Sequence, residues 1–289
     1  MLSEKGIMIR IHVILKKAVK RMHRKQSLTP HQTLRSLFQH HINVTHISEV
    51  LHTCQLHDDT NVAKHIMETY DYDCLGVEDG GRVVGYIDKA GLGPGTCYDY
   101  VKSFHPREIV SETTSLMQIL YLFKETNRLF ILEGNQITRL TTSADLQKTP
   151  VQLFLFGLVS LVEMYLLEII KISLPNNTWR PYIKKKRLIQ AEEMYKQRKE
   201  QNEAIELVDC LQLCDKRDIV INDTRLFKQL RFSSKNKAYT FLGRFERLRN
   251  QLAHAQPYTK EFSTKEIIAL VQQTEHLLTV CEKVLEDAE

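Results

Sequence analysis

Two stretches of about fifty residues repeat the same order of predicted elements, and this repeat constrains the fold more than any other feature of the sequence. Each contains a helical segment, a strand, a turn of Gly and polar residues, and a second strand. The first unit has its helix at 62–68 and strands at 74–77 and 82–87, and the second has its helix at 115–123 and strands at 129–132 and 136–141. The short turns predict antiparallel pairing. We therefore expect a duplicated α+β unit.

The second half of the chain has a different character, because its apolar residues recur with helical rather than strand spacing. Residues 151–174 are the most hydrophobic run, and their length would suit a membrane span. However, Glu163, Glu168 and Lys171 lie inside the run, and each charge would cost a span about 3 kcal/mol. We therefore expect a buried helix of an all-α bundle, with no membrane partner.

Length and composition agree with a soluble protein of two domains. The chain has 289 residues, of which 43% are hydrophobic and 26% charged, which is ordinary for a globular protein with a sizeable core. We predict a basic N-terminal segment at 1–45, an α+β pair at 46–150 and an all-α domain at 151–289. The two units of the pair would occupy about 46–96 and 97–150.

The N-terminal segment is more basic than the rest of the chain. Residues 1–45 contain nine Lys and Arg against a single acid, Glu4, whereas the whole chain has a net charge of only +5. The segment is interpreted either as a helix or arm with a solvated basic face, or as an arm that contacts nucleic-acid phosphates. Its apolar run at 7–15 precedes the charges, the reverse of a signal peptide, so we expect none.

Six cysteines are scattered through the chain without the spacing of a metal site. No pair of them forms a Cys-x-x-Cys motif, and no Cys and His residues stand at zinc spacing. We expect reduced thiols in a cytoplasmic protein and no metal.

A helix near the C-terminus carries the residues with the most specific chemistry. Its apolar positions recur every three or four residues and form one stripe: Phe241, Phe245, Leu248, Leu252 and Ala255. At about 100° per residue, Asn250 and His254 fall on the opposite face, and Arg249 lies between the two faces. Pro257 is expected to end this helix.

These three polar residues suit the cleavage of RNA without a metal. A neutral His254 can take a proton from a ribose 2′-hydroxyl, and Arg249 can hold the negative charge on the attacked phosphate. Asn250 can orient either group by hydrogen bonding. The alternative is an ordinary surface helix, because the same Arg-to-His spacing recurs at Arg35 and His40.

The motif Arg249-Asn250-x-x-x-His254, behind the acidic apolar helix 161–168, resembles the signature of the HEPN superfamily. The resemblance covers roughly residues 150–289 and implies a helical bundle. Many such bundles are metal-independent RNases with a composite site across a homodimer. It implies that His254 is the general base or proton donor, that Arg249 stabilises phosphorane charge, and that Asn250 orients the two. It also implies that Glu163 assists them.

A toxin subgroup of that superfamily carries a tyrosine two residues after the histidine, which a partner modifies. Here Tyr258 lies four residues after His254, beyond Pro257, so this sequence departs from the toxin pattern. A toxin of a toxin–antitoxin pair nevertheless remains one alternative function.

The duplicated unit resembles a pair of CBS modules, a Bateman module, over the length of both units. In that family a Thr or Ser at the end of the second strand and an Asp three residues later hold a nucleotide. Thr142 and Asp145 match this pattern, although Arg139 replaces the usual glycine and would either crowd the pocket or bind phosphate. The resemblance implies one adenine-nucleotide site, with ATP or AMP as a regulatory ligand.

The first unit departs from the pattern, because Asp88 and Gly91 stand where Thr and Asp are expected, although Gly85 keeps the glycine. We expect its half-site to be degenerate. For the second unit the alternative is that Thr142 and Asp145 merely cap the following helix. Both roles are compatible with one another.

Basic residues near the signature helix predict an RNA groove. Arg244, Arg247 and Lys235 belong to that helix and are candidate RNA-binding residues. A second basic run at 180–199 lies near three aromatic residues that can stack on bases, although such a run is usually a solvated face. These aromatic residues are Trp179, Tyr182 and Tyr195.

Together these features predict a nucleotide-regulated, metal-independent endoribonuclease that acts as a homodimer and leaves a cyclic phosphate. The main alternative is a non-catalytic, nucleotide-sensing binding protein. Neither the RNA substrate nor the direction of regulation follows from the residues.

Overall fold

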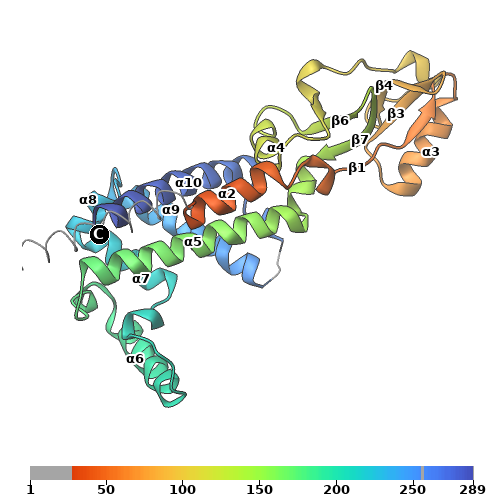
Figure 1. Ribbon diagram of the computed structural model, residues 1–289. Coiled ribbons are helices and arrows are strands. Elements are labelled where there is room, and N and C mark those ends of the chain that lie inside the picture. Colours follow the sequence, from red (N-terminus) through yellow and green to blue (C-terminus); the bar gives the residue numbers. More distant parts are fainter. Residues whose placement is uncertain (1–27, 255–256, 289) are drawn as a thin grey trace, which may run out of the picture.

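The computed structural model describes residues 28–254 and 257–288 and combines an α/β part with a set of helices (Figure 1). The α/β part lies at one end of the helical layer. The apolar run at 7–15 and most of the basic N-terminal segment lie outside the described residues.

The α/β part contains the two predicted units. The first consists of β2 (Thr53–Gln55), α3 (Thr60–Tyr70), β3 (Cys74–Asp79) and β4 (Arg82–Asp88). The second consists of β5 (Ile109–Ser111), α4 (Leu116–Leu122), β6 (Arg128–Glu133) and β7 (Gln136–Thr142). A short strand, β1 (Glu49–Val50), pairs with β7, so the sheets have the orders β2-β3-β4 and β1-β7-β6-β5. In each unit the first strand is parallel to the second and the last two are antiparallel.

The strand register shows that the units are equivalent residue by residue. Val77 is paired with Gly85 in the first unit, and Ile131 is paired with Arg139 in the second, each next to a break in register. Asp88 and Thr142 are equivalent in the same way, because they face the first residues of β3 and β6. The expected duplication is therefore present, with a β-bulge at the same place in both hairpins.

A glycine is needed at position 85 because the chain passes close to it. Tyr86 and Lys102 exchange backbone hydrogen bonds of 3.0 and 2.8 Å, which brings the Lys102 carbonyl against the strand. A Cβ atom on Gly85 would lie 2.5 Å from that carbonyl oxygen. The first unit therefore keeps its glycine for packing.

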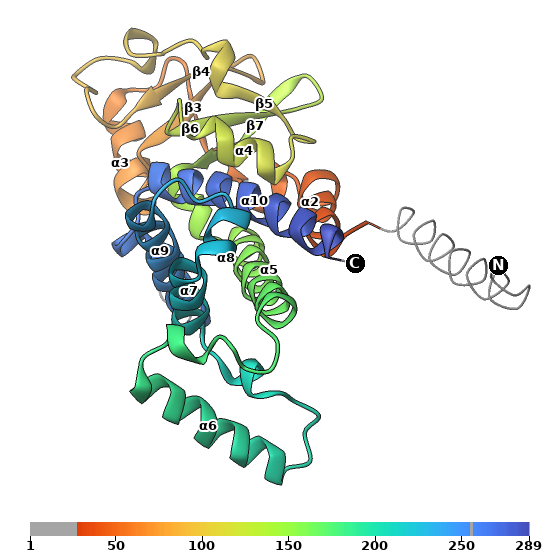
Figure 2. The ribbon, with the colours of Figure 1, turned by 90° about the vertical axis from the view of Figure 1, so that its left-hand side faces the viewer.

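The helical part is organised around α5 (Thr149–Ser173). Its other helices are α2 (Pro30–His40), α6 (Lys185–Glu200), α7 (Leu213–Asn222), α8 (Thr224–Gln229), α9 (Lys235–Ala253) and α10 (Thr264–Asp287). Helices α2, α7, α9 and α10 pack against α5, whereas α6 stands apart and contacts mainly the 3₁₀ turn Leu207–Cys210 (Figure 2). By length and composition α5 could cross a membrane, yet half of its most apolar window is buried within the protein.

One hydrophobic cluster joins parts that the sequence separates. It contains Phe38 of α2, Leu120 of α4, Leu158 of α5 and Leu278 of α10. Phe38 and Phe154 pack with ring centroids 4.9 Å apart. The predicted segments 1–45, 46–150 and 151–289 therefore do not correspond to separate cores, because α2 and the second unit are built into the helical core.

The two α/β units meet through a smaller cluster and one ion pair. Tyr86 of the first unit packs on Phe130 of the second, with centroids 4.9 Å apart. Beside them, Arg128 donates to Asp88 at 2.5 Å, and Lys102 donates to the other oxygen of Asp88 at 2.8 Å. Burial alone would raise the pKa of Asp88, but the hydrogen bonds from Arg128 and Lys102 lower it below its ordinary value.

We predict that Asp88→Asn lowers the free energy of unfolding by about 2 kcal/mol, because charge-assisted hydrogen bonds to a half-buried carboxylate are lost. A carboxyl whose pKa falls on folding stabilises the protein above its unfolded pKa, near 3.8, and loses this effect as the pH falls through the lower folded value. The difference from wild type should therefore shrink in that acidic range. Urea unfolding measures both effects, and Asp79→Asn, at the exposed turn, is the control.

Candidate functional site

Helix α9 buries the face that its apolar spacing predicts, together with three further residues. Phe245 and Leu248 are buried, Phe241 and Leu252 are partly buried, and Ala255 lies outside the described residues. The further buried residues are Ala238, Leu242 and Gln251. Gln251 is 9% exposed, and among the described residues its Oε1 has no hydrogen-bond partner. The helix begins with the Ser234 hydroxyl, which accepts from the Lys237 backbone N–H, and ends at Ala253.

Three of the predicted catalytic residues lie together. Arg249 Nε is 3.5 Å from Glu163 Oε1 of α5, and Arg249 Nη1 donates to Asn250 Oδ1 at 3.1 Å. The side chains of Arg249 and Glu163 are 39% and 25% exposed, so the pair sits at the rim of the core and remains accessible to solvent. The predicted neighbourhood of Arg249 and Glu163 is therefore present.

His254 lies at the end of α9 and is exposed. Its backbone N–H donates to the carbonyls of Asn250 and Gln251 at 3.2 Å, so the residue continues the helical turn of Asn250. Within the described chain, no hydrogen bond or ion pair joins its imidazole to Arg249 or Glu163. The structure therefore places His254 on the Asn250 side of the helix, with its side chain exposed.

The segment after His254 is anchored at the junction between the α/β part and α5. Tyr258 is 1% exposed, and its hydroxyl donates to the Leu146 carbonyl just before α5 begins. Burial raises the pKa of the Tyr258 phenol, which therefore stays protonated and can donate. Tyr258 thus has a structural role in this protein.

Lys216 of α7 also belongs to the site, although sequence reasoning missed it. It is 7% exposed, and burial lowers the pKa of its ammonium, an effect that nearby Glu163 opposes and nearby Arg249 reinforces. Glu163 therefore pairs with Arg249 of α9 and is close enough to Lys216 of α7 for its charge to act on the Lys216 pKa. The available signal was the spacing of Lys216 with Ile219 and Val220, which puts a lysine on the buried face of α7.

The predicted RNA-binding residues are spread along α9. Arg244 lies 3.5 Å from Glu266, and Arg247 lies 3.7 Å from Glu261, in exposed pairs that can exchange partners. Lys235 is exposed in the first turn, about 28 Å along the helix from His254. Arg244 and Arg247 thus lie near Arg249, whereas Lys235 does not.

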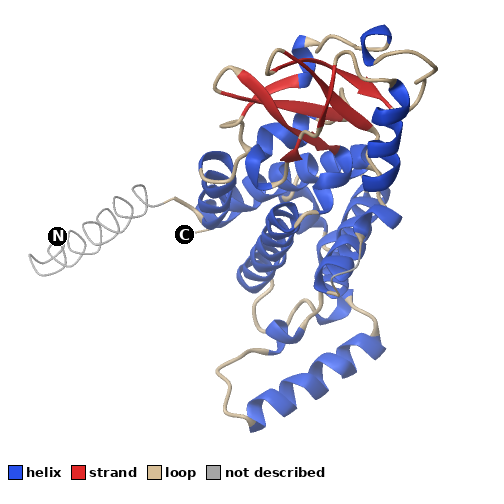
Figure 3. Ribbon diagram, turned by 90° about the vertical axis from the view of Figure 1, so that its right-hand side faces the viewer, coloured by secondary structure: helices blue, strands red, loops and turns tan. Residues whose placement is uncertain are grey.

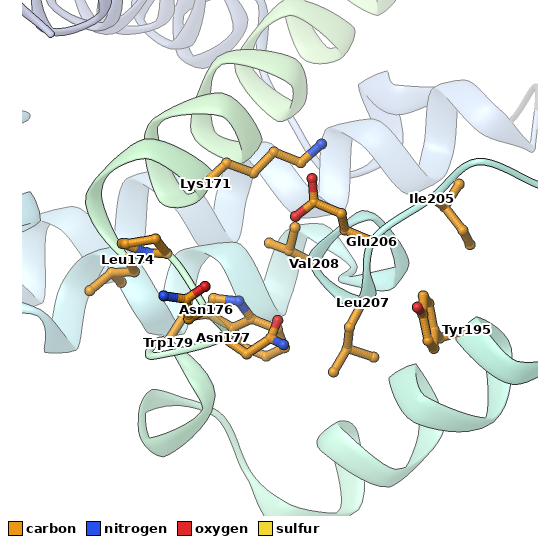
Figure 4. Close-up of a pocket in the computed structure, with 11 residues that line it drawn as sticks. Lys171, Leu174, Asn176, Asn177, Trp179, Tyr195, Ile205, Glu206, Leu207 and Val208 are labelled. Atoms are coloured by element: carbon orange, nitrogen blue, oxygen red, sulfur yellow. The ribbon is translucent and has the colours of Figure 1, made fainter.

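The aromatic residues near the second basic run do not form a stacking surface. Trp179 is 1% exposed, Tyr182 donates its hydroxyl to Asp223, and the Lys199 ammonium lies over the Tyr195 ring. Trp179 and Tyr195 line opposite walls of a pocket of about 320 Å³ beyond the end of α5 (Figure 4). This pocket holds none of the predicted catalytic residues.

The predicted nucleotide-binding residues of the second unit are engaged with the chain itself. Asp145 Oδ2 accepts from the Thr142 backbone N–H at 2.7 Å and from the Thr142 hydroxyl at 3.3 Å, which is the capping role. Its Oδ1 lies 2.7 Å from Lys148 Nζ. Arg139 donates to the side chain and carbonyl of Ser48 at 2.7 and 2.8 Å. A nucleotide at this site would have to share or replace these contacts.

In the described first unit, the positions that correspond to Thr142 and Asp145 by spacing do not provide a similar site. Asp88, the counterpart of Thr142, is held by Arg128 and Lys102, as described above. Gly91 has a positive φ of 99° and no side chain to contribute. Sequence reasoning missed Thr96 and Asp99, which form a cap like that of Thr142 and Asp145, with a 2.8 Å hydrogen bond from the Thr96 N–H. An insertion before Thr96 hides this similarity.

Comparisons with known proteins reach only the α/β part. No family model and no curated protein matches the chain. Solved structures that match include an uncharacterized conserved protein from Pyrococcus horikoshii, at 20% identity and a TM-score of 0.33, over 37% of this chain and 90% of that one. A CBS domain-containing protein from Bacillus anthracis matches at 15% identity and a TM-score of 0.33, over 38% of this chain and 93% of that one. A putative acetoin utilization protein from Vibrio cholerae matches at 17% identity and a TM-score of 0.34, over 39% of this chain and 92% of that one.

The neighbours of the N-terminal 37% or so of the chain thus include CBS-domain proteins. At these identities and TM-scores, neither ligand nor activity is transferred from them. No comparison shows a HEPN domain in the helical part, so that resemblance stays a prediction.

We predict that Lys216→Met raises the free energy of unfolding at neutral pH by about 1 kcal/mol, because the buried ammonium is replaced by an apolar group of similar shape. A lysine with a lowered folded pKa makes wild-type stability rise with pH up to the unfolded value near 10.5. This rise should be absent in Lys216→Met. Urea unfolding from neutral to alkaline pH tests both points, with exposed Lys265→Met as control; a less stable Lys216→Met would contradict the prediction.

Proposed function

We propose that this protein is a metal-independent endoribonuclease, acting as a homodimer and regulated by an adenine nucleotide. One observation carries the proposal of cleavage. The guanidinium of Arg249, paired with Glu163 and bonded to Asn250, lies at the rim of the core one turn or so from the exposed His254. Such a rim offers a cation and an imidazole to the same solvent-accessible ligand.

The electrostatics of the rim suit a phosphodiester. Arg249 lies beside Glu163, and Lys216 is close enough to both for their charges to affect its pKa, with Asp209 and Asp215 also in range. Glu163 fixes the Nε edge of the guanidinium and leaves other N–H groups of Arg249 for phosphate oxygens. The charge that develops on an attacked phosphate would be stabilised there.

The proton transfers fall to His254. As a base, its imidazole takes the proton of a ribose 2′-hydroxyl, and the resulting alkoxide attacks the adjacent phosphorus. The bond to the 5′-oxygen breaks, the protonated imidazole of His254 returns its proton to that oxygen, and the products are a 2′,3′-cyclic phosphate and a free 5′-hydroxyl. Asn250 accepts from Arg249, which holds the guanidinium on the His254 side of the helix.

We predict that wild-type protein cleaves end-labelled RNA in EDTA, and that His254→Ala reduces the rate by about 10²- to 10⁴-fold through loss of proton transfer. Arg249→Ala should reduce it by about 10²- to 10³-fold. Product ends are identified by direct phosphorylation of the free 5′-hydroxyl with polynucleotide kinase, without prior phosphatase treatment, and by the mass of the cyclic phosphate. The control is His276→Ala, an exposed histidine of α10 away from the site.

Two outcomes would contradict this reading. Equal cleavage by wild type and His254→Ala would remove His254 from the mechanism. No cleavage under any condition would favour the non-catalytic, nucleotide-sensing protein, or a toxin held inactive by a separately encoded neutraliser. Circular dichroism of each variant separates these outcomes from misfolding.

The nucleotide part of the proposal rests on a cluster in the second unit. Arg139 binds Ser48, and Lys148 donates to the Ile47 carbonyl at 2.7 Å, so two cations and Asp145 surround the segment 47–49. A carboxylate can accept both ribose hydroxyls, and the two cations can hold phosphate. The resemblance to CBS modules supports an adenine nucleotide as the ligand.

The second unit also has direct contacts through which a ligand can act on the helices. Tyr121 of α4 donates to Glu275 of α10 at 2.7 Å, and Lys124 Nζ donates to Gln272 of α10 at the same distance. A shift of α4 would therefore act on Glu275 and Gln272 of α10, which is the longest of the helices that pack against α5. This path supports regulation by the α/β part.

We predict that ATP or AMP binds wild-type protein in isothermal titration calorimetry, and that Asp145→Asn weakens binding at least about tenfold by removing a charged acceptor for the ribose hydroxyls. Arg139→Ala should weaken ATP binding as well. Asp99→Asn is a matched control, because Asp99 caps the first unit with the same geometry. If both aspartate variants bind like wild type, Asp145 has only a capping role.

A further inference from the structure

One side of α5 exposes large apolar side chains along much of its length. Leu153, Phe156 and Met164 are 59%, 47% and 39% exposed, and Leu167 is partly exposed on the same side. The opposite side, which contains Phe154, Leu158 and Val162, is buried in the core. Helix α5 forms one flank of the helical part (Figure 2), and Figure 3 shows most of the helices below the strands. Soluble proteins rarely leave such a continuous stripe uncovered.

The stripe is symmetric about its middle residue. Leu153 and Phe156 lie seven and four residues before Ser160, and Met164 and Leu167 lie four and seven residues after it. On a helix these spacings keep all five residues within one face about 100° wide. Ser160 is exposed and small, so a second helix can approach closely there. A two-fold contact between identical chains requires a surface that is complementary to a copy of itself, and the symmetric spacing of the stripe meets this requirement.

The charges of α5 select the antiparallel orientation. Glu163, Glu168 and Lys171 all lie after Ser160, and residues 149–162 carry no charge. With the two-fold axis at Ser160, Glu163 lies at the level of the other copy's residue 157 and Glu168 at the level of residue 152, both uncharged. A parallel pair would instead align each glutamate with its own copy and repel.

We propose that a second copy of this chain binds along the stripe Leu153–Phe156–Ser160–Met164–Leu167, with the two α5 helices antiparallel about Ser160. The interface stands on the stripe itself, and its link to catalysis rests on the proposed function. Glu163, which holds Arg249, borders the stripe, so each copy's α5 forms a wall beside the other copy's Arg249 site. The three exposed side chains cover less than the roughly 800 Å² per partner of a typical stable interface, so association is reversible.

The oligomeric state tests this surface without reference to RNA. Sedimentation velocity over the micromolar range should show a monomer–dimer equilibrium for wild type. Phe156→Glu should raise the dimer dissociation constant at least about 100-fold, because a charge enters the contact. Ile172→Glu is the matched control, since Ile172 is 50% exposed on the same helix but about 120° from Ser160. It should dimerise like wild type.

Disulfide trapping tests the orientation. Ser160→Cys should form a covalent dimer with itself, whereas Met164→Cys should not, because an antiparallel pair separates the two copies of residue 164 by about 12 Å along the axis. A mixture of Phe156→Cys and Met164→Cys should give the crossed dimer. Wild type, with five buried cysteines and the partly exposed Cys214, is the blank.

Three results would overturn the proposal: a monomer throughout the concentration range, a dimer that Phe156→Glu leaves intact, or self-crosslinking of Met164→Cys as efficient as that of Ser160→Cys. A monomer that binds neutral phosphatidylcholine vesicles through Phe156 would assign the stripe to a lipid surface instead. A dimer without RNase activity would leave this interface intact and remove only the proposed catalytic function.

Discussion

The burial of one face of α5 is the interaction on which the rest of the structure depends. Its apolar side chains form the surface against which α2, α7, α9 and α10 pack, and the helix starts directly after the second α/β unit. Hydrophobic stabilisation is proportional to the apolar area that is removed from water. Among the described elements, α5 packs against the largest number of other elements, so the core depends on its burial. The α/β part and the helices are therefore stabilised together.

The polar cluster at the rim is a consequence of the same packing. Glu163 lies one helical turn from the buried residues Val159 and Leu166, and α7 and α9 bring Lys216 and Arg249 to it from two sides. The apolar contacts fix the separation of these three groups. Each of the three groups thus has an opposite charge near it, and Arg249 and Glu163 are partly exposed to solvent.

The sequence was sufficient for those features that arise from local periodicity. The repeat predicted both α/β units, the apolar run predicted α5 as a core helix, and the stripe of α9 predicted its buried Phe245 and Leu248. The proximity of Glu163 and Arg249 came from the family resemblance rather than from periodicity. Features set by distant contacts were not predictable.

Three features show this limit. The packing of α2 on α5 depends on side chains such as Leu34, which fills the space over Gly157. The engagement of Arg139 by Ser48 depends on the pairing of β1 with β7, between residues about ninety positions apart. Lys216 is buried because α5 and α9 cover it, and a lysine within an apolar stripe does not by itself indicate which charges it meets.

The bond between the Tyr258 hydroxyl and the Leu146 carbonyl has a mechanical consequence. Tyr258, four residues after His254, is tied to the 3₁₀ turn Ser143–Gln147 that precedes α5, while Arg249 lies beside Glu163 in the middle of α5. The two ends of the stretch 249–258 are therefore attached to two different elements. A movement of the turn 143–147 relative to α5 would act on the end of α9 that carries His254, while Arg249 stays with Glu163.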